Sequence, residues 1–201
     1  MNAHPWFFRL NLVATAMALG VVVLGAWVRL TDAGLGCPDW PGCYGQLDVP
    51  NTPEAIAAAN AAFPDTPVDV GKGWREMVHR YLASGLGLLI VGLGGFAWRQ
   101  RHRPGQPWRV PLALIALVCF QGLLGAWTVT WQLKPAVVTA HLLGGLTTLS
   151  LLWWVTLRSN YLGGGGRLAR VPGLGAFLAI GVAAAVAQIT LGGWTSTNYA
   201  A

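Results

Sequence analysis

The sequence predicts an all-α, polytopic membrane protein: a four-helix transmembrane bundle plus a fifth transmembrane helix. Its 201 residues are 54% hydrophobic and only 10% charged, whereas soluble domains carry about 25% charged residues. It also contains five apolar runs, each of roughly the length that crosses the hydrocarbon core of a bilayer. These runs are Leu10–Val28, Leu82–Trp98, Val110–Thr130, Ala136–Leu157 and Val171–Trp194.

The first run is interpreted as a retained helix rather than a secretory signal. It is longer than the apolar region of a signal peptide, and its end at residues 25–29 has no small-x-small cleavage site.

Basic residues predict the orientation of these helices, because cytoplasmic segments carry an excess of Lys and Arg. Arginines crowd the segments before the first run, between the second and third, and between the fourth and fifth. They are Arg9, Arg99, Arg101, Arg103, Arg109, Arg158, Arg167 and Arg170. We therefore expect a cell (inner) membrane protein with a cytoplasmic N-terminus and with loop 31–75 outside. The net charge of +6 reflects this topology, and no basic stripe interleaved with aromatics indicates nucleic-acid binding.

A four-residue motif recurs at the outer end of every odd-numbered run. Leu-Gly-Ala-Trp at residues 24–27 returns at 124–127, and Leu-Gly-Gly-Trp follows at 191–194. After the first two copies come an outer connector and then a run with an early histidine, which predicts a duplicated unit. The third copy has no such continuation, so we expect a truncated form of a longer protein. Residues 1–160 would form the bundle, and 161–201 an inner linker and the first helix of an incomplete second bundle.

His79 and His141 are the leading candidates for functional residues. Both lie near the outer ends of even-numbered runs, where an ionisable side chain costs a few kcal/mol to keep and so suggests function. Two imidazoles at matched depth, on helices taken to be neighbours, predict the axial ligands of a haem iron. Arg80 and Arg29 are candidates to bind the haem propionates, because a guanidinium fork matches a carboxylate bidentately.

Glu76 lies three residues before His79 and therefore on the same helical face. A Glu-x-x-His pair can serve a di-metal site, but that design needs further carboxylates, and the last three runs contain no Asp or Glu. Two interpretations of Glu76 stay open. It is a carboxylate beside a histidine ligand, or a helix-start residue that suits the helix dipole.

Cys37 and Cys43 lie in the outer connector, on the side where disulfides persist. The prolines and glycine between them make a compact turn that can bring the two sulfurs together. A zinc site is disfavoured, because two cysteines without nearby partners fall short of four ligands. A disulfide here is either a structural clip, which the physical argument favours, or a redox relay.

Taken together, these motifs resemble those of the haem A synthase family. The run Trp27–Pro41, the motif Glu76–Tyr81, the His141 helix and the segment Leu191–Ala200 resemble the family in the same order. The resemblance implies a fold of eight spanning helices in two four-helix bundles, of which this chain is a truncated version. It also implies oxidation of the C8 methyl of haem O to the formyl group of haem A.

The resemblance further implies a role for each candidate residue. His79 and His141 would flank the substrate haem, Glu76 would be the essential carboxylate, and Cys37 with Cys43 would be the structural or redox-active pair of the loop. A haem b is expected in the missing C-terminal half. The expected partners are membrane lipid, a farnesyltransferase that supplies haem O, and an electron acceptor. The sequence leaves the oligomeric state open, a homo-oligomer included.

The predicted function is therefore an oxidoreductase of the haem A synthase type, in its substrate-haem-binding part. An ionised Glu76 would stabilise positive charge at the reacting methyl or accept its proton. The alternative is a bis-His b-type cytochrome subunit that only transfers electrons and has little need of Glu76. A third interpretation, a transport or assembly subunit without haem, predicts a colourless protein. The sequence does not settle whether the shortened chain is active alone.

Overall fold

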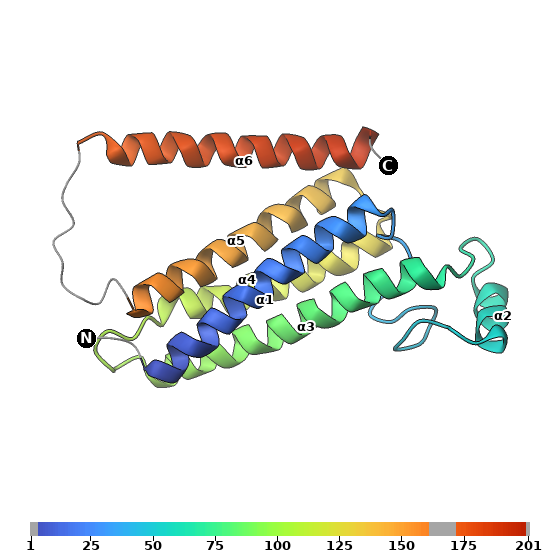
Figure 1. Ribbon diagram of the computed structural model, residues 1–201, viewed down its shortest axis with the longest axis horizontal. Helices are drawn as coiled ribbons and strands as arrows, with labels where there is room; N and C mark the ends of the chain where they lie inside the picture. Colours follow the sequence, from blue (N-terminus) through green and yellow to red (C-terminus); the bar gives the residue numbers. More distant parts are fainter. Residues whose placement is uncertain (1–3, 161–171, 200–201) are drawn as a thin grey trace.

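The computed structural model describes residues 4–160 and 172–199, and all of its regular elements are helices (Figure 1). Five of them, all except α2, are long and apolar enough to cross a membrane. The all-α fold with five candidate spans is thereby confirmed. The helices are α1 (Pro5–Leu30), α2 (Pro53–Ala62), α3 (Val70–Arg99), α4 (Arg109–Thr130), α5 (Pro135–Asn160) and α6 (Leu174–Tyr199).

Helices α1, α3, α4 and α5 form a four-helix bundle in which α1 and α4 each contact both α3 and α5. Across the described ranges no contact joins α3 to α5, so these two helices stand at opposite corners. The expectation that the two histidine helices are neighbours is therefore wrong. Each histidine helix packs against the motif helix before it, and the two pairs then pack side by side, which places the histidine helices diagonally.

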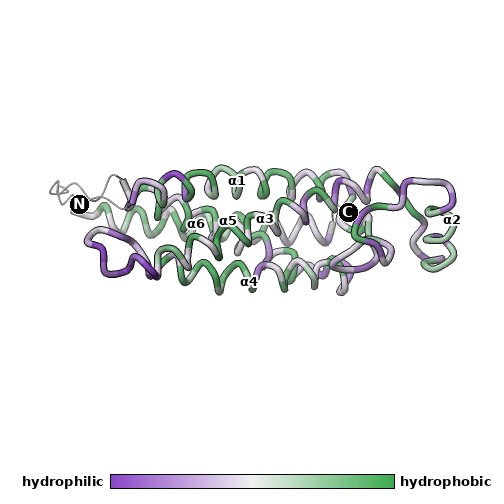
Figure 2. The backbone as a smooth tube through the Cα atoms, turned by 90° about the horizontal axis from the view of Figure 1, so that it is seen from below, coloured by the Kyte–Doolittle hydropathy of each residue, from purple (hydrophilic) through white to green (hydrophobic). Residues whose placement is uncertain are grey.

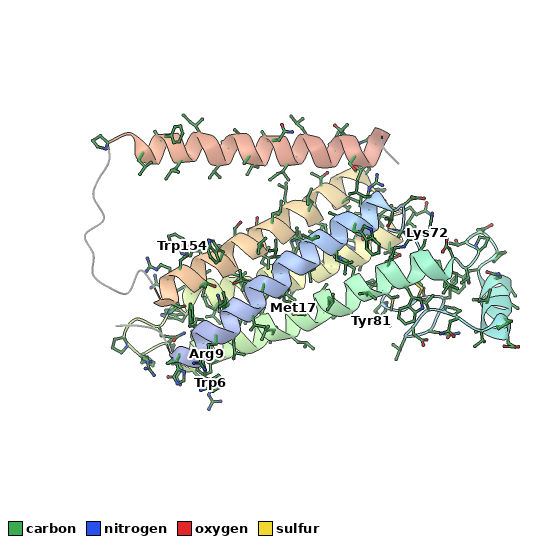
Figure 3. All side chains as sticks on the ribbon, viewed as in Figure 1. Trp6, Arg9, Met17, Lys72, Tyr81 and Trp154 are labelled. Carbon is green, nitrogen blue, oxygen red and sulfur yellow. A yellow bond between two sulfur atoms is a disulfide. The ribbon has the colours of Figure 1, made fainter. Side chains whose placement is uncertain are left out.

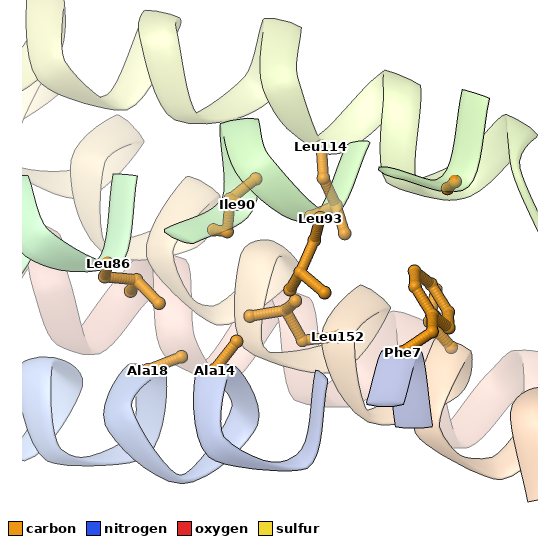
Figure 4. Packing of buried hydrophobic residues seen from close by; sticks show 10 residues of the cluster. Phe7, Ala14, Ala18, Leu86, Ile90, Leu93, Leu114 and Leu152 are labelled. Carbon is orange, nitrogen blue, oxygen red and sulfur yellow. The ribbon is translucent and has the colours of Figure 1, made fainter. Parts of the chain in front are cut away.

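Residues along the middle of the bundle helices are mostly hydrophobic, and hydrophilic residues gather in the connectors at the ends (Figure 2). Close packing of small residues holds helices together in lipid, where the hydrophobic effect between them is absent. A Cβ at Gly94 of α3 would lie only 2.5 Å from Ile115 Cδ1 of α4. The buried core, shown in Figure 4, consists of Phe7, Ala14, Ala18, Leu86, Ile90, Leu93, Ala97, Leu114, Leu152 and Val155.

Polar side chains also link α1 to α5 near the cytoplasmic end predicted above. Asn11 Nδ2 donates hydrogen bonds to Leu152 O (2.9 Å) and Thr156 Oγ1 (2.6 Å). Thr15 Oγ1 lies 3.1 Å from the same Thr156 hydroxyl. These bonds fix the register of the two helices, because their polar atoms find no comparable partners in lipid.

The helices extend beyond the apolar runs that predicted them. Helix α3 begins at Val70 rather than Leu82, and the Asp69 carboxylate caps it by accepting a hydrogen bond from Lys72 N (2.9 Å). A hydropathy pattern detects only the part of a helix that lies in hydrocarbon. It therefore does not predict the polar turns at the outer ends of the helices. The predicted inner linker, including Arg167 and Arg170, lies largely outside the described residues. Helix α6 packs against α5.

Candidate functional site

The two histidines occupy equivalent positions in the two helix pairs. His79 of α3 lies against α1, and a Cβ at Gly25 would come within 2.8 Å of its Cε1 atom. His141 of α5 lies against α4, and a Cβ at Gly125 would come within 3.6 Å of its Cε1 atom. Both glycines belong to the recurring Leu-Gly-Ala-Trp motif. The sequence repeat is therefore a structural repeat, in which a motif glycine makes room for the imidazole of the following helix.

Each imidazole has a buried Nδ1 without a hydrogen-bond partner among the described residues. Leaving a buried polar atom unpaired costs about 1–3 kcal/mol, so such atoms indicate a ligand. Gly25 and Gly125 lie near the C-terminal ends of α1 and α4, so the two imidazoles lie toward the same end of the bundle. The bundle thus brings both imidazoles to one region, although their helices do not touch.

The ligand set around these histidines fits haem better than a bare metal ion. Within residues 4–160 and 172–199, no group of three or more His, Cys, Asp or Glu side chains could hold a metal. Two histidines fall short of the four ligands of a zinc site. They suffice for a haem iron, which takes its other four ligands from the porphyrin and needs only axial ligands from the protein.

Glu76 connects the histidine helix to the outer loop. It is buried, with only 4% of its surface exposed, and it lies nearly one turn before His79 on α3. Its Oε2 accepts a hydrogen bond from Cys37 N (3.0 Å), and its Oε1 pairs with the Arg80 guanidinium. The carboxylate is therefore held in a fixed position near His79, with both oxygens bonded.

Arg80 organises the loop above the bundle. Its Nη1 donates to the carbonyl oxygens of Asp39 (3.0 Å), Pro41 (3.3 Å) and Gly42 (2.5 Å), while its Nη2 binds Glu76. The guanidinium thus clamps the cysteine loop to α3. Its role toward a haem propionate stays a prediction.

Arg29, the second candidate for a propionate, lies at the end of α1 and reaches α6. Its Nη2 donates to Ser196 O, and its buried Nε has no hydrogen-bond partner among the described residues. The residue therefore links α1 to α6 and keeps one donor for a further ligand.

Cys37 and Cys43 form a disulfide, as predicted (Figure 3). Both cysteines are fully buried, in a small core of the loop with Tyr44 and Val49. Burial raises the pKa of the Tyr44 phenol. Two buried sulfurs are poorly accessible to an external thiol, so the geometry favours a structural clip.

An ion pair at the rim joins the start of the loop to α3. Lys72 Nζ lies 2.7 Å from Asp32 Oδ2. The hydrogen bond and the positive charge of Lys72 lower the pKa of the Asp32 carboxyl.

Gln121 is a buried polar residue that the sequence analysis missed. It lies on α4, one turn before Gly125, and its amide occupies the space that a Cβ at Gly144 of α5 would need. Its Nε2 has no hydrogen-bond partner in the part of the chain that the structure describes. A glutamine within an otherwise apolar run was the available signal.

Fold and site together define a polytopic helical membrane protein in which each of two helix pairs places one histidine against a motif glycine. The chain belongs to the COX15-CtaA family of cytochrome oxidase assembly proteins, which it matches over residues 8–201. The family resemblance noted in the sequence is thereby confirmed.

Curated relatives named heme A synthase match most of the chain. The protein of Shewanella oneidensis is 43% identical over 98% of this chain, which covers 58% of that protein. That of Sphingopyxis alaskensis is 32% identical over 90% of the chain, with 56% of the relative covered. That of Alkalihalophilus pseudofirmus is 30% identical over 71% of the chain, with 43% covered. This chain therefore spans about half the length of the curated relatives it matches. No solved structure matches it.

Proposed function

We propose that this chain is the substrate-haem-binding part of a haem A synthase, the oxidoreductase that converts the C8 methyl of haem O to a formyl group. The pair of half-buried imidazoles, each with a buried Nδ1, carries the proposal. Among the described residues the Nδ1 of each ring has no hydrogen-bond partner, and each ring lies against a motif glycine. Family membership supports it, because the matching relatives are named heme A synthase.

In this proposal the two histidines hold the substrate and Glu76 serves the reaction. His79 and His141 would hold the haem iron and so orient the macrocycle within the bundle. The haem would supply the oxidation chemistry of its own methyl group, and the electrons would pass to an external electron acceptor. Glu76, held by Cys37 N and Arg80, supplies negative charge that stabilises positive charge at the reacting methyl, or accepts its proton. Arg29 is the guanidinium with a donor left for a propionate.

The remaining expectations follow from the same proposal. The loop of residues 31–75 faces the extracytoplasmic side of a cell membrane and the arginine-rich end faces the cytoplasm. A haem b belongs to the part of the longer protein beyond this chain. A farnesyltransferase that supplies haem O and an electron acceptor are the partners. Residues 161–201 form an inner linker and the first helix of an incomplete second bundle.

Haem spectra of the purified chain test the ligands. With His79→Ala or His141→Ala we expect loss of the low-spin bis-histidine absorption. The control His102→Ala, an exposed residue of the arginine-rich connector, should leave the spectrum unchanged. A bis-histidine spectrum that survives both alanine variants would overturn the ligand assignment.

Haem extracted from cells that produce haem O tests Glu76. Glu76→Gln keeps the size of the side chain and removes its charge, so we expect haem to remain bound while haem A formation stops. Conversion at the unsubstituted level would contradict the role of Glu76 and favour a carrier that only transfers electrons.

A further inference from the structure

A pocket of about 380 Å³ opens at the end of the bundle opposite the histidines. It lies between the start of α4 and the end of α5, and no part of the proposed haem site contributes to it. Figure 3 shows Trp154, one of its residues, at the end of the bundle far from Lys72. The lining residues are Gln106, Pro107, Trp108, Arg109, Val110, Trp154, Val155 and Arg158.

The pocket carries positive charge that this chain does not neutralise. Arg109 and Arg158 approach it from two different helices, and neither forms an ion pair within the described residues. All seven acidic residues of the chain lie between Asp32 and Glu76, at the other end of the bundle. A counter-ion for the two guanidiniums therefore has to come from outside the chain.

Tryptophan rings hold both guanidiniums at the rim. The Arg109 guanidinium lies 5.2 Å from the ring centre of Trp108, and that of Arg158 lies 5.9 Å from the ring centre of Trp154. A guanidinium over an aromatic face keeps its N–H edge free for a bidentate acceptor. Tryptophan favours the level of lipid headgroups, because its ring is apolar and its N–H is polar.

We propose that this pocket binds the phosphate headgroup of an anionic phospholipid. The two guanidiniums bind the phosphate, while Val110, Val155 and the tryptophan rings contact the glycerol and upper acyl region. Free phosphate is also an anion, but it would not contact these apolar side chains. The lining residues therefore favour a phospholipid. Basic pockets between transmembrane helices at the cytoplasmic side are a general way of holding anionic headgroups. This proposal does not depend on haem.

Native mass spectrometry of the detergent-purified chain tests the site. The chain is titrated separately with phosphatidylglycerol, phosphatidylcholine and inorganic phosphate. We expect preferential retention of phosphatidylglycerol, and the double variant Arg109→Gln with Arg158→Gln should weaken it at least about tenfold. The matched control is Arg99→Gln with Arg101→Gln. It removes the same charge from the same end outside the pocket, and Arg101 also stacks on a tryptophan.

Retention by the control and loss by the pocket variant support the proposal. Arg109→Lys with Arg158→Lys should recover most of the binding, which separates charge from a folding defect. An equal loss in both glutamine pairs would overturn it, because binding would then follow general surface charge. Phosphatidylcholine bound as tightly as phosphatidylglycerol would overturn the role of charge, and inorganic phosphate bound as tightly would overturn the assignment to lipid.

Discussion

The helix pairs α1–α3 and α4–α5 follow one plan but carry different chemistry. In each, a motif helix, an outer connector and a histidine helix follow one another, and a glycine supports the imidazole. The first connector is long and holds a disulfide, a small core and the bonds of Glu76 and Arg80. The second is a tight turn in which Gln132 and Leu133 adopt positive φ angles of 48° and 55°. The duplicated unit explains why each helix pair carries one histidine. The charged groups next to His79, Glu76 and Arg80, belong to the first helix pair.

The largest expected difference between the two helix pairs is the loss of stability when the residue three positions before each histidine is replaced. Glu76→Ala removes the carboxylate that accepts from Cys37 N and pairs with Arg80, and breaking a buried ion pair costs about 3–5 kcal/mol. We expect about 3 kcal/mol, because Arg80 keeps its carbonyl acceptors. The matched variant in the second pair, Val138→Ala, should cost about 1 kcal/mol. Chemical unfolding in detergent measures both, and equal losses would contradict a special role for the first connector.

Removal of the disulfide should cause the second-largest loss of stability. Closing so short a loop stabilises a fold by about 2 kcal/mol, so Cys37→Ser with Cys43→Ser should lose about that much. Haem binding should remain, because the bond holds the loop and does not involve His79 or His141, the proposed ligands. The control is Cys119→Ser, an exposed thiol of α4, which should have no measurable effect. Full stability combined with loss of haem A formation would instead identify the pair as a redox relay.

The sequence predicted what depends on composition and short-range order. Hydropathy located five spans, the recurring motif revealed the duplication, and the setting of Cys37 and Cys43 indicated their disulfide. It did not predict that α3 and α5 stand diagonally, because a one-dimensional repeat does not fix which pair packs against which. Helix α2 was also missed, although Thr52 and Pro53 are typical of a helix start.

The contacts of buried polar atoms were equally out of reach of the sequence. The contact between Gly25 and His79 depends on how closely α1 approaches α3. The sequence alone does not give that interhelical distance. The same holds for the bonds that hold Glu76 to Cys37 N and to Arg80. The proposed roles of these residues remain predictions.

Replacing Gly25 and Gly125 with alanine, in separate variants, compares how tightly each glycine packs against its histidine. In Gly25→Ala the new methyl would lie 2.8 Å from His79 Cε1, so the ring has to shift. Overpacking of this kind costs about 1–3 kcal/mol, and we expect a perturbed bis-histidine spectrum with weaker haem retention. In Gly125→Ala the methyl lies 3.6 Å from His141 Cε1, an ordinary contact. That variant should keep its spectrum, and identical spectra in the two variants would contradict the asymmetry.

The smallest effect is expected at the Asp32–Lys72 pair, which has no counterpart in the second connector. Lys72 lowers the pKa of Asp32 below its ordinary value of 3.8. A carboxyl with a depressed pKa in the folded protein contributes stability that is fully present above the unfolded pKa and is lost as the pH falls through the folded one. Asp32→Asn should therefore leave stability near pH 7 almost unchanged, since the pair is exposed. It should remove only a small part of the decline in stability below about pH 4. Thermal unfolding across that pH range, with Asp65→Asn as the control in the same connector, measures the difference. A large loss at neutral pH would show that this rim contact, and not the Glu76–Arg80 clamp, holds the first connector to α3.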